Sequence, residues 1–170
     1  MSEQNDDDEN WLEEEALDVE KSSEGNNKWR ILIVDDELDV HAVTRLALKN
    51  ISFKDQDIEI VSAYSGQEGF DVLAKDPDIC MVLLDVVMET ENAGLVLAQR
   101  IRDELNNDLV RIILRTGQPG QAPEQKIIVD YDINDYKLKT ELTAQKMFTC
   151  VISSLRAYEG LKTIDRKSVV

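Results

Sequence analysis

Short apolar runs alternate with segments of helical periodicity five times after residue 28, and this alternation limits the folds open to the chain. The runs 31–34 and 79–84 are wholly apolar, which is typical of strands buried on both faces of a parallel sheet. The predicted strands are residues 31–34, 58–63, 79–84, 110–114 and 134–138. The predicted helices are residues 39–49, 66–75, 93–105, 124–130 and 141–158. The order predicts an α/β doubly wound parallel sheet with right-handed crossovers.

Local signals set some helix boundaries and faces. Ser65 is a plausible N-cap, and Pro123 can open the short helix that follows it. The residues expected to pack inward are Val40, Val43, Leu46, Ala47 and Leu48 in the first helix, Ile127, Ile128 and Val129 in the fourth, and Met147, Phe148, Val151, Ile152 and Leu155 in the last.

Charge divides the chain into three parts. Residues 1–28 hold eleven acidic and two basic residues, so we expect a mostly disordered tail. Residues 29–158 form the predicted folded domain, and residues 159–170 are read as a polar extension or the start of a linker to an output domain. Within the tail, five apolar residues are compatible with either a solvated tail or a short amphipathic helix that docks on a partner: Trp11, Leu12, Ala16, Leu17 and Val19.

The composition excludes several classes of function. With 35 acidic and 19 basic residues, the net charge of −16 argues against direct binding of nucleic acid or an anionic membrane. No apolar run approaches the ~20 residues that span a bilayer, and the N-terminus lacks a secretory signal, so we expect a cytoplasmic chain. Cys80 and Cys150 are predicted to be buried thiols. No glycine-rich phosphate loop follows the first strand, which disfavours nucleotide binding.

Polar residues follow four of the predicted strands. They are Asp35 and Asp36, Asp85, Thr116, and Lys139. The carboxyl ends of parallel strands share one edge of a sheet, so these side chains should meet. Three adjacent carboxylates repel one another unless a hard divalent cation such as Mg²⁺ joins them. A lysine and a hydroxyl beside that cluster would suit phosphoryl transfer, with Asp85 as the nucleophile.

In order and spacing, the segments 31–37, 83–88, 116–117 and 135–139 resemble the receiver domain of two-component response regulators. The resemblance covers residues 29–158. It implies a flavodoxin-like (βα)5 fold with strand order 2-1-3-4-5, and a cytoplasmic phosphoprotein that acts in a phosphorelay.

The resemblance also implies a role for each site residue. Asp85 would accept a phosphoryl group from a histidine kinase or phosphotransfer protein, with slow autodephosphorylation afterwards. Lys139 would pair with the phosphoryl oxygens, and Thr116 would bond one of them while Tyr136 changes rotamer as the second switch residue. The Mg²⁺ ligands would be Asp36, Asp85 and the carbonyl of Val87, with Asp35 bound directly or through water.

The implied output is a change of partner preference at the face formed by the fourth helix, the fifth strand and the fifth helix, which is also a face for a homodimer. Residues 111–122, 130–136 and 140–146 look more specifically like N-terminal receivers of longer bacterial proteins that often end in an HD-GYP cyclic-di-GMP phosphodiesterase domain. We expect any such output domain to lie outside these 170 residues.

Some positions depart from the family pattern. Thr140 and Glu89 stand where prolines are usual, which leaves the Lys139–Thr140 peptide either trans or cis and puts access to Asp85 in question. Arg115 replaces a small residue and is interpreted as a surface arginine. The single histidine, His41, is interpreted as a packing residue.

Two other functions remain open. The first is a phosphate-independent adaptor that uses the fold only for docking. The second is a haloacid-dehalogenase-like phosphohydrolase, which would need a second aspartate two residues after the nucleophile, where this chain has Val87.

Overall fold

The first strand lies at the centre of the sheet and pairs in parallel with two neighbours. The computed structural model describes residues 27–117 and 125–168 and contains a six-stranded sheet of order β2-β3-β1-β4-β5-β6. The strands are β1 Trp29–Val34, β2 Ser52–Phe53, β3 Gln56–Ala63, β4 Met81–Asp85, β5 Arg111–Thr116 and β6 Asp135–Leu138. The helices are α2 Leu38–Ala47, α3 Gly66–Lys75, α4 Ala93–Asp103, α5 Gln125–Asp130 and α6 Ala144–Ser168.

The five parallel strands follow the predicted topology. Strand β1 pairs in parallel with β3 and β4, and β5 pairs in parallel with β4 and β6. The order β3-β1-β4-β5-β6 is the predicted order 2-1-3-4-5, so the doubly wound fold is confirmed.

Strand β2 was not predicted. It pairs antiparallel with β3 through a two-residue turn, Lys54–Asp55, in which both residues have positive φ. Such turns usually carry Asn or Gly, so the Lys-Asp pair gave no turn signal.

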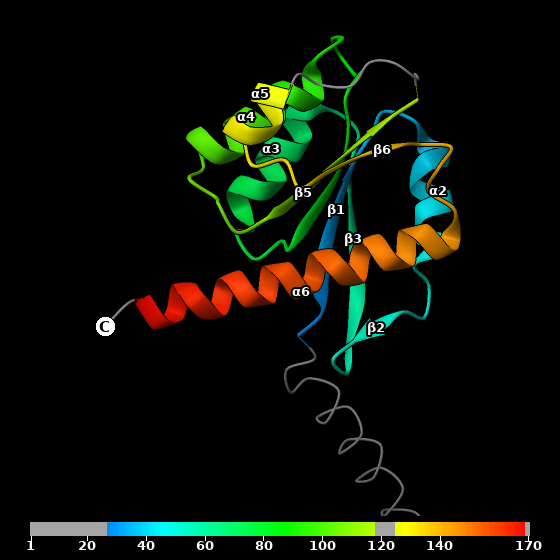
Figure 1. Ribbon diagram of the computed structural model, residues 1–170. Helices are drawn as coiled ribbons and strands as arrows, with labels where there is room; N and C mark the ends of the chain where they lie inside the picture. Colours follow the sequence, from blue (N-terminus) through cyan, green and yellow to red (C-terminus); the bar gives the residue numbers. More distant parts are fainter. Residues whose placement is uncertain (1–26, 118–124, 169–170) are drawn as a thin grey trace, which may run out of the picture.

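Alternate residues along the strands pack into two separate hydrophobic cores, one on each face of the sheet. Ile31 and Ile33 pack with Met147 and Val151 on the side covered by α2 and α6, whereas Leu32 and its neighbours pack under α3, α4 and α5. Figure 1 shows these two helical layers on opposite faces of the sheet. Burial of β1 and β4 on both faces explains their continuous apolar sequence.

Helix ends agree with the sequence in part. The Ser65 hydroxyl accepts a hydrogen bond from the Glu68 N–H, which confirms the predicted cap. Helix α6 does not end near residue 158 but continues to Ser168, because nothing in the sequence stops it and Gly160 is accommodated in its interior. Pro123 and the tail segment around Trp11 lie outside the described residues.

Several predicted inward residues face solvent. Phe148 on α6 is 46% exposed and Val129 on α5 is 76% exposed. Val43 and Leu46 on α2 are 65% and 75% exposed, because the inward side of α2 is occupied by polar side chains. Helical periodicity defines an apolar face but not the direction in which that face points.

A buried arginine ties the helical layer to the strand ends. Arg102 on α4 donates hydrogen bonds to the carbonyls of Asn107, Val110, Tyr131 and Asp132 at 2.8–3.0 Å. Burial lowers the pKa of Arg102 to about 10. The side chain therefore holds the loop before β5 and the loop before β6 against one helix.

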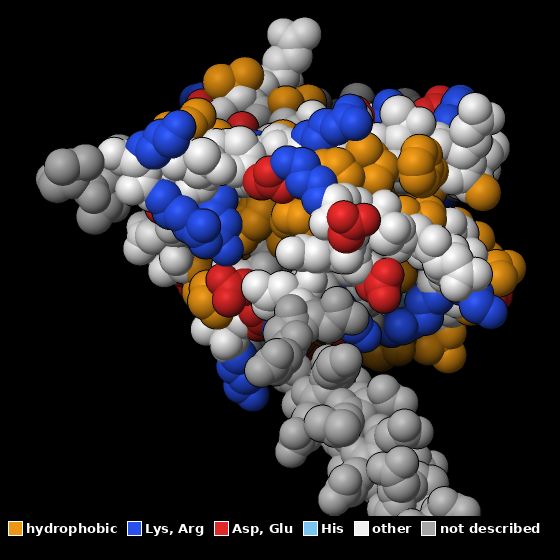
Figure 2. All heavy atoms as spheres, turned by 90° about the horizontal axis from the view of Figure 1, so that it is seen from below, with side chains coloured by type: hydrophobic (Ala, Val, Ile, Leu, Met, Phe, Trp, Pro, Cys, Tyr) orange, Lys and Arg blue, Asp and Glu red, His pale blue; other side chains and the backbone are white. Residues whose placement is uncertain are grey.

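The two cysteines lie at different depths in the structure. Cys80 is buried and Cys150 is half-buried, and both are free thiols. On the face shown in Figure 2, acidic and basic side chains are interspersed with hydrophobic ones. None of the helices in the described ranges has both the length and the apolar character needed to span a membrane.

Candidate functional site

Three carboxylates gather where β1 and β4 end. Asp35 follows β1, Asp36 comes next, and Asp85 is the last residue of β4. One carboxylate oxygen from each lies within 4.8 Å of the others. Asp35 is 0% exposed and Asp85 is 4% exposed, whereas Asp36 faces solvent. The predicted meeting of these side chains is thus present in the structure.

Lys139 reaches the same cluster from the loop after β6. Its Nζ atom lies 3.0 Å from Asp35 Oδ2, 3.1 Å from Asp85 Oδ2 and 3.3 Å from Glu37 Oε1. The Lys139 N–H donates to the Thr116 carbonyl at 2.7 Å, which attaches the loop to the end of β5. A single ammonium group is therefore paired with the carboxylates of Asp35, Asp85 and Glu37.

Burial and crowding change the acidity of this cluster. Desolvation and, next, the charge of Asp35 raise the pKa of Asp85, Lys139 opposes both, and together they bring this pKa to about 6. Burial alone would lower the pKa of Lys139, but the carboxylates of Asp35 and Asp85 outweigh burial and raise it. Asp35 and Asp36 both raise the pKa of Asp85, so the carboxylates repel one another, and a cation among them would stabilise the ionised cluster.

The donor set fits a hard divalent cation. Asp35 Oδ2 is buried and, apart from its ion pair with Lys139, no donor in the described part of the chain is directed at it. Carboxylate and carbonyl oxygens are the ligands that Mg²⁺ prefers, and the half-buried Val87 lies two residues beyond Asp85. The residues present are therefore compatible with a magnesium site.

Thr116 and Tyr136 complete the predicted set. Thr116 is the last residue of β5, is 1% exposed, and lies opposite Leu138 of β6. Tyr136 sits two residues earlier on β6, packed against the core beneath α3, α4 and α5. The described residues offer its buried hydroxyl no hydrogen-bond partner. The structure brings both residues to the strand pair beside Lys139.

Comparisons with known proteins agree with this arrangement. No protein-family model matches the chain. It is 52% identical over 137 residues to 3'3'-cGAMP-specific phosphodiesterase 2 of Vibrio cholerae, an alignment that covers 81% of this chain and 26% of that protein. It is 27% identical over 110 residues to a chemotaxis protein CheY homolog of Campylobacter jejuni, which covers 65% of this chain and 80% of that protein.

A solved structure has the same fold. The CheY-like receiver domain of Methanospirillum hungatei matches with a TM-score of 0.65 and 22% identity, over 79% of this chain and 99% of that one. The chain has the fold of CheY-like response-regulator receiver domains. It spans about a quarter of the length of the Vibrio relative. Receiver domains are phosphoacceptors as a family, and the aspartate cluster agrees with that role.

Two loops lack the prolines that are usual in receiver domains. Among the described residues no peptide bond is cis, so the Lys139–Thr140 peptide is trans. The Glu89 carboxylate accepts a hydrogen bond of 2.8 Å from the Gly66 N–H at the start of α3. A carboxylate is favourable at a helix N-terminus, so Glu89 anchors the loop after Asp85.

Two residues that position this carboxylate cluster were not predicted from the sequence. His41 is buried, with Nε2 2.8 Å from the Asp35 carbonyl and Nδ1 2.9 Å from Ser62 Oγ, so it links α2 to the end of β1. At Gly94, an added Cβ would lie 2.1 Å from the Asp85 carbonyl oxygen. Only glycine permits this approach of α4 to the strand that carries Asp85.

Arg115 is not the surface residue that the sequence suggested. It is 3% exposed, and its Nη1 donates to Thr44 Oγ1 at 3.2 Å. Burial lowers its pKa, while Asp35 and Asp85 oppose that effect. Strand periodicity contained the missed signal, because Arg115 points to the same side of β5 as the buried Ile113.

Proposed function

We propose that Asp85 is the phosphoacceptor of this receiver domain, taking its phosphoryl group from a histidine kinase or phosphotransfer protein. The observation that carries the proposal is the 3.1 Å ion pair between Lys139 and the nearly buried Asp85, within a cluster of three carboxylates. A solvated acidic turn would neither bury two of those carboxylates nor share one lysine between strands that are distant in sequence.

The residues have complementary tasks in phosphoryl transfer. An Asp85 carboxylate oxygen forms the new bond to phosphorus while the bond to the donor's leaving group breaks, and the leaving group keeps that electron pair. Lys139 neutralises charge on the equatorial oxygens, and the Thr116 hydroxyl donates a hydrogen bond to one of them. Because these groups come from β4, β5 and the β6 loop, the fold itself holds them in place.

The acidic cluster is proposed to hold Mg²⁺. Asp36, Asp85 and the Val87 carbonyl would be its ligands, with Asp35 contributing directly or through water. The ion would supply positive charge to the phosphoryl oxygens and to the repelling carboxylates. His41 fixes the backbone at Asp35, so it acts as a positioning residue for this set.

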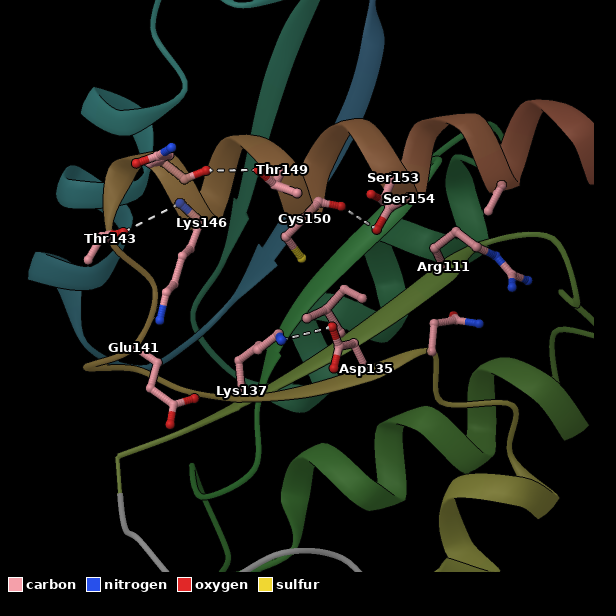
Figure 3. Close-up of a pocket in the computed structure, with 14 residues that line it drawn as sticks. Arg111, Asp135, Lys137, Glu141, Thr143, Lys146, Thr149, Cys150, Ser153 and Ser154 are labelled. Atoms are coloured by element: carbon pink, nitrogen blue, oxygen red, sulfur yellow. Dashed lines mark hydrogen bonds and ion pairs between the residues drawn. The ribbon is translucent and has the colours of Figure 1, made fainter.

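The switch would act on the face formed by α5, β6 and α6. Phosphate on Asp85 would draw Thr116 inward, and Tyr136 would follow on the adjacent strand. That face includes a groove of about 850 Å³ between α6 and β6. Figure 3 shows Lys137 and Lys146 on its opposite walls. This surface is our proposed contact for an output domain, an effector protein or a second copy of the chain.

We further propose a cytoplasmic regulator whose output is cyclic-dinucleotide hydrolysis, on the basis of the 52% identity to the Vibrio phosphodiesterase. In this view residues 1–28 are a tail, 29–158 the receiver, and 159–170 lead to the output. The test replaces the corresponding segment of the Vibrio protein with this receiver. Hydrolysis of 3'3'-cGAMP should respond to a phosphodonor and lose that response with Asp85→Asn; an unresponsive chimera would contradict the assignment.

Intact-mass spectrometry with acetyl phosphate tests the phosphoacceptor proposal. One labile phosphoryl group should appear only with Mg²⁺, and it should disappear in Asp85→Asn. The matched control is Asp39→Asn, which removes an exposed carboxylate on α2 and should leave phosphorylation intact. Absence of an adduct, together with absence of beryllofluoride binding, would favour the phosphate-independent adaptor.

A further inference from the structure

Helix α2 presents its apolar side to solvent. Its buried residues are the polar His41 and Thr44. Leu38, Val43 and Leu46 are 70%, 65% and 75% exposed. A surface helix normally buries its apolar stripe, and neighbouring exposed apolar side chains mark an interaction site. The side of α2 that a partner could cover is therefore defined by these three residues.

A groove continues this surface toward α6. It has a volume of about 430 Å³ and lies between α2 and the start of α6. We call it the α2–α6 groove. Its apolar walls come chiefly from Val40, Val43, Leu46, Ala47, Leu142 and Met147. Three charged residues also line this mostly apolar groove: Asp39, Arg115 and Lys139.

The guanidinium group of Arg115, which lines the groove, can donate more hydrogen bonds than the described residues accept. The side chain is almost wholly buried, yet no described residue offers its Nε and Nη2 atoms a hydrogen-bond partner. Asp35 and Asp85 act on its charge through space, and Lys139 is already paired with both carboxylates. Buried guanidinium groups are usually hydrogen-bonded, so a carboxylate entering the groove would satisfy this one.

The chain contains a segment with complementary chemistry. Residues 11–20 carry five apolar side chains, Trp11, Leu12, Ala16, Leu17 and Val19, and five carboxylates. The nine residues 20–28 can extend about 30 Å, which exceeds the length of about 20 Å of the six-residue strand β1. The segment can therefore reach any point along α2 from the start of β1.

We propose that residues 11–20 of the same chain dock in the α2–α6 groove, with apolar side chains against Val43 and Leu46 and a carboxylate on Arg115. The short tether places the segment at an effective concentration on the order of millimolar, so a weak contact suffices for occupancy. This interaction covers the apolar side of α2 and does not depend on phosphorylation.

Fluorine NMR of the full chain labelled with 5-fluorotryptophan tests the contact. Trp11→Phe assigns the two resonances, and Trp29 in β1 serves as an internal control. The Trp11 resonance should be displaced from its position in the urea-unfolded chain. The double variant Val43→Asp with Leu46→Asp should return it to that position, whereas Val129→Asp, an equally exposed site on α5, should leave it displaced.

A second set of variants tests the charge component without altering the folded domain. Changing the five carboxylates of residues 11–20 to amides keeps every apolar contact and leaves a neutral oxygen acceptor for Arg115, but removes the negative charge. The displacement of Trp11 should fall by about half or more, since charge-assisted hydrogen bonds are roughly twice as strong as neutral ones.

Three results would overturn the proposal. One is a Trp11 resonance at its unfolded position in the unmodified chain, and another is a displacement that the groove variants leave unchanged. The third is a displacement that depends on protein concentration together with dimer formation in sedimentation, which would assign the groove to a second copy. None of these measurements uses phosphorylation, so their failure would leave the role of Asp85 untouched.

Discussion

Removing the proposed phosphoacceptor should stabilise the metal-free protein. Asp85 has a pKa of about 6 in the folded state against 3.8 for an ordinary aspartate, because it is desolvated beside Asp35. The folded state thus binds this proton more tightly than the unfolded state. The resulting stability is fully present below about pH 4 and is lost as pH rises through 6. At 1.4 kcal/mol per pH unit, ionised Asp85 costs about 3 kcal/mol near pH 7.5.

Urea unfolding in EDTA measures this effect. Asp85→Asn should exceed the unmodified protein in unfolding free energy by about 3 kcal/mol near pH 7.5, and the difference should nearly vanish near pH 4. Adding Mg²⁺ at the higher pH should narrow the gap, because the ion stabilises the ionised cluster. The control Asp39→Asn should change stability by less than about 0.5 kcal/mol. A less stable Asp85→Asn, or a difference independent of pH, would refute the reasoning.

Other consequences can be measured with the same assay. Gly94→Ala should lower the free energy of unfolding by about 3 kcal/mol, because its Cβ would lie 2.1 Å from the Asp85 carbonyl oxygen. Gly160→Ala, with open space around it, should raise this free energy by about 0.5–1 kcal/mol. Equal effects of the two substitutions would argue against the close approach at Gly94. Arg102→Met should lower the free energy of unfolding by about 3 kcal/mol, since four carbonyls lose their donor. Arg100→Met, which breaks an ion pair between a half-buried arginine and the exposed Glu104, should lower it by less than about 1 kcal/mol. Cys80, with a pKa raised to about 11 by burial, should resist thiol reagents near pH 8 until the protein unfolds, and fast labelling would contradict its burial.

The fold could be predicted from the sequence because a strand that is buried on both faces has a continuous run of apolar residues. β1 and β4 are such strands; Asp35 directly follows β1 and Asp85 is the last residue of β4, so the position of the site follows from the strand order. The cluster of Asp35, Asp36 and Asp85 could be anticipated for the same reason. The side-chain roles assigned to that cluster remain predictions that phosphorylation experiments must test.

The features that the sequence did not predict depend on the direction in which side chains point and on close contacts between elements. Periodicity marked the apolar residues of α2 but not that polar His41 and Thr44 would occupy its inward side. Arg115 was placed at the surface because arginine usually is, although its strand position put it inside. Gly94 carries no signal in a single sequence, since its requirement arises only when α4 approaches the backbone of Asp85.

Borohydride trapping of the phosphorylated protein tests the central claim most directly. Reduction of an aspartyl phosphate converts that aspartate to homoserine, which peptide sequencing by mass spectrometry locates. After treatment with acetyl phosphate and Mg²⁺, homoserine should appear at position 85 and not at Asp35 or Asp36. Homoserine at either of those neighbours, or at no position in a protein that has gained phosphate, would contradict the assignment of Asp85 as the phosphoacceptor.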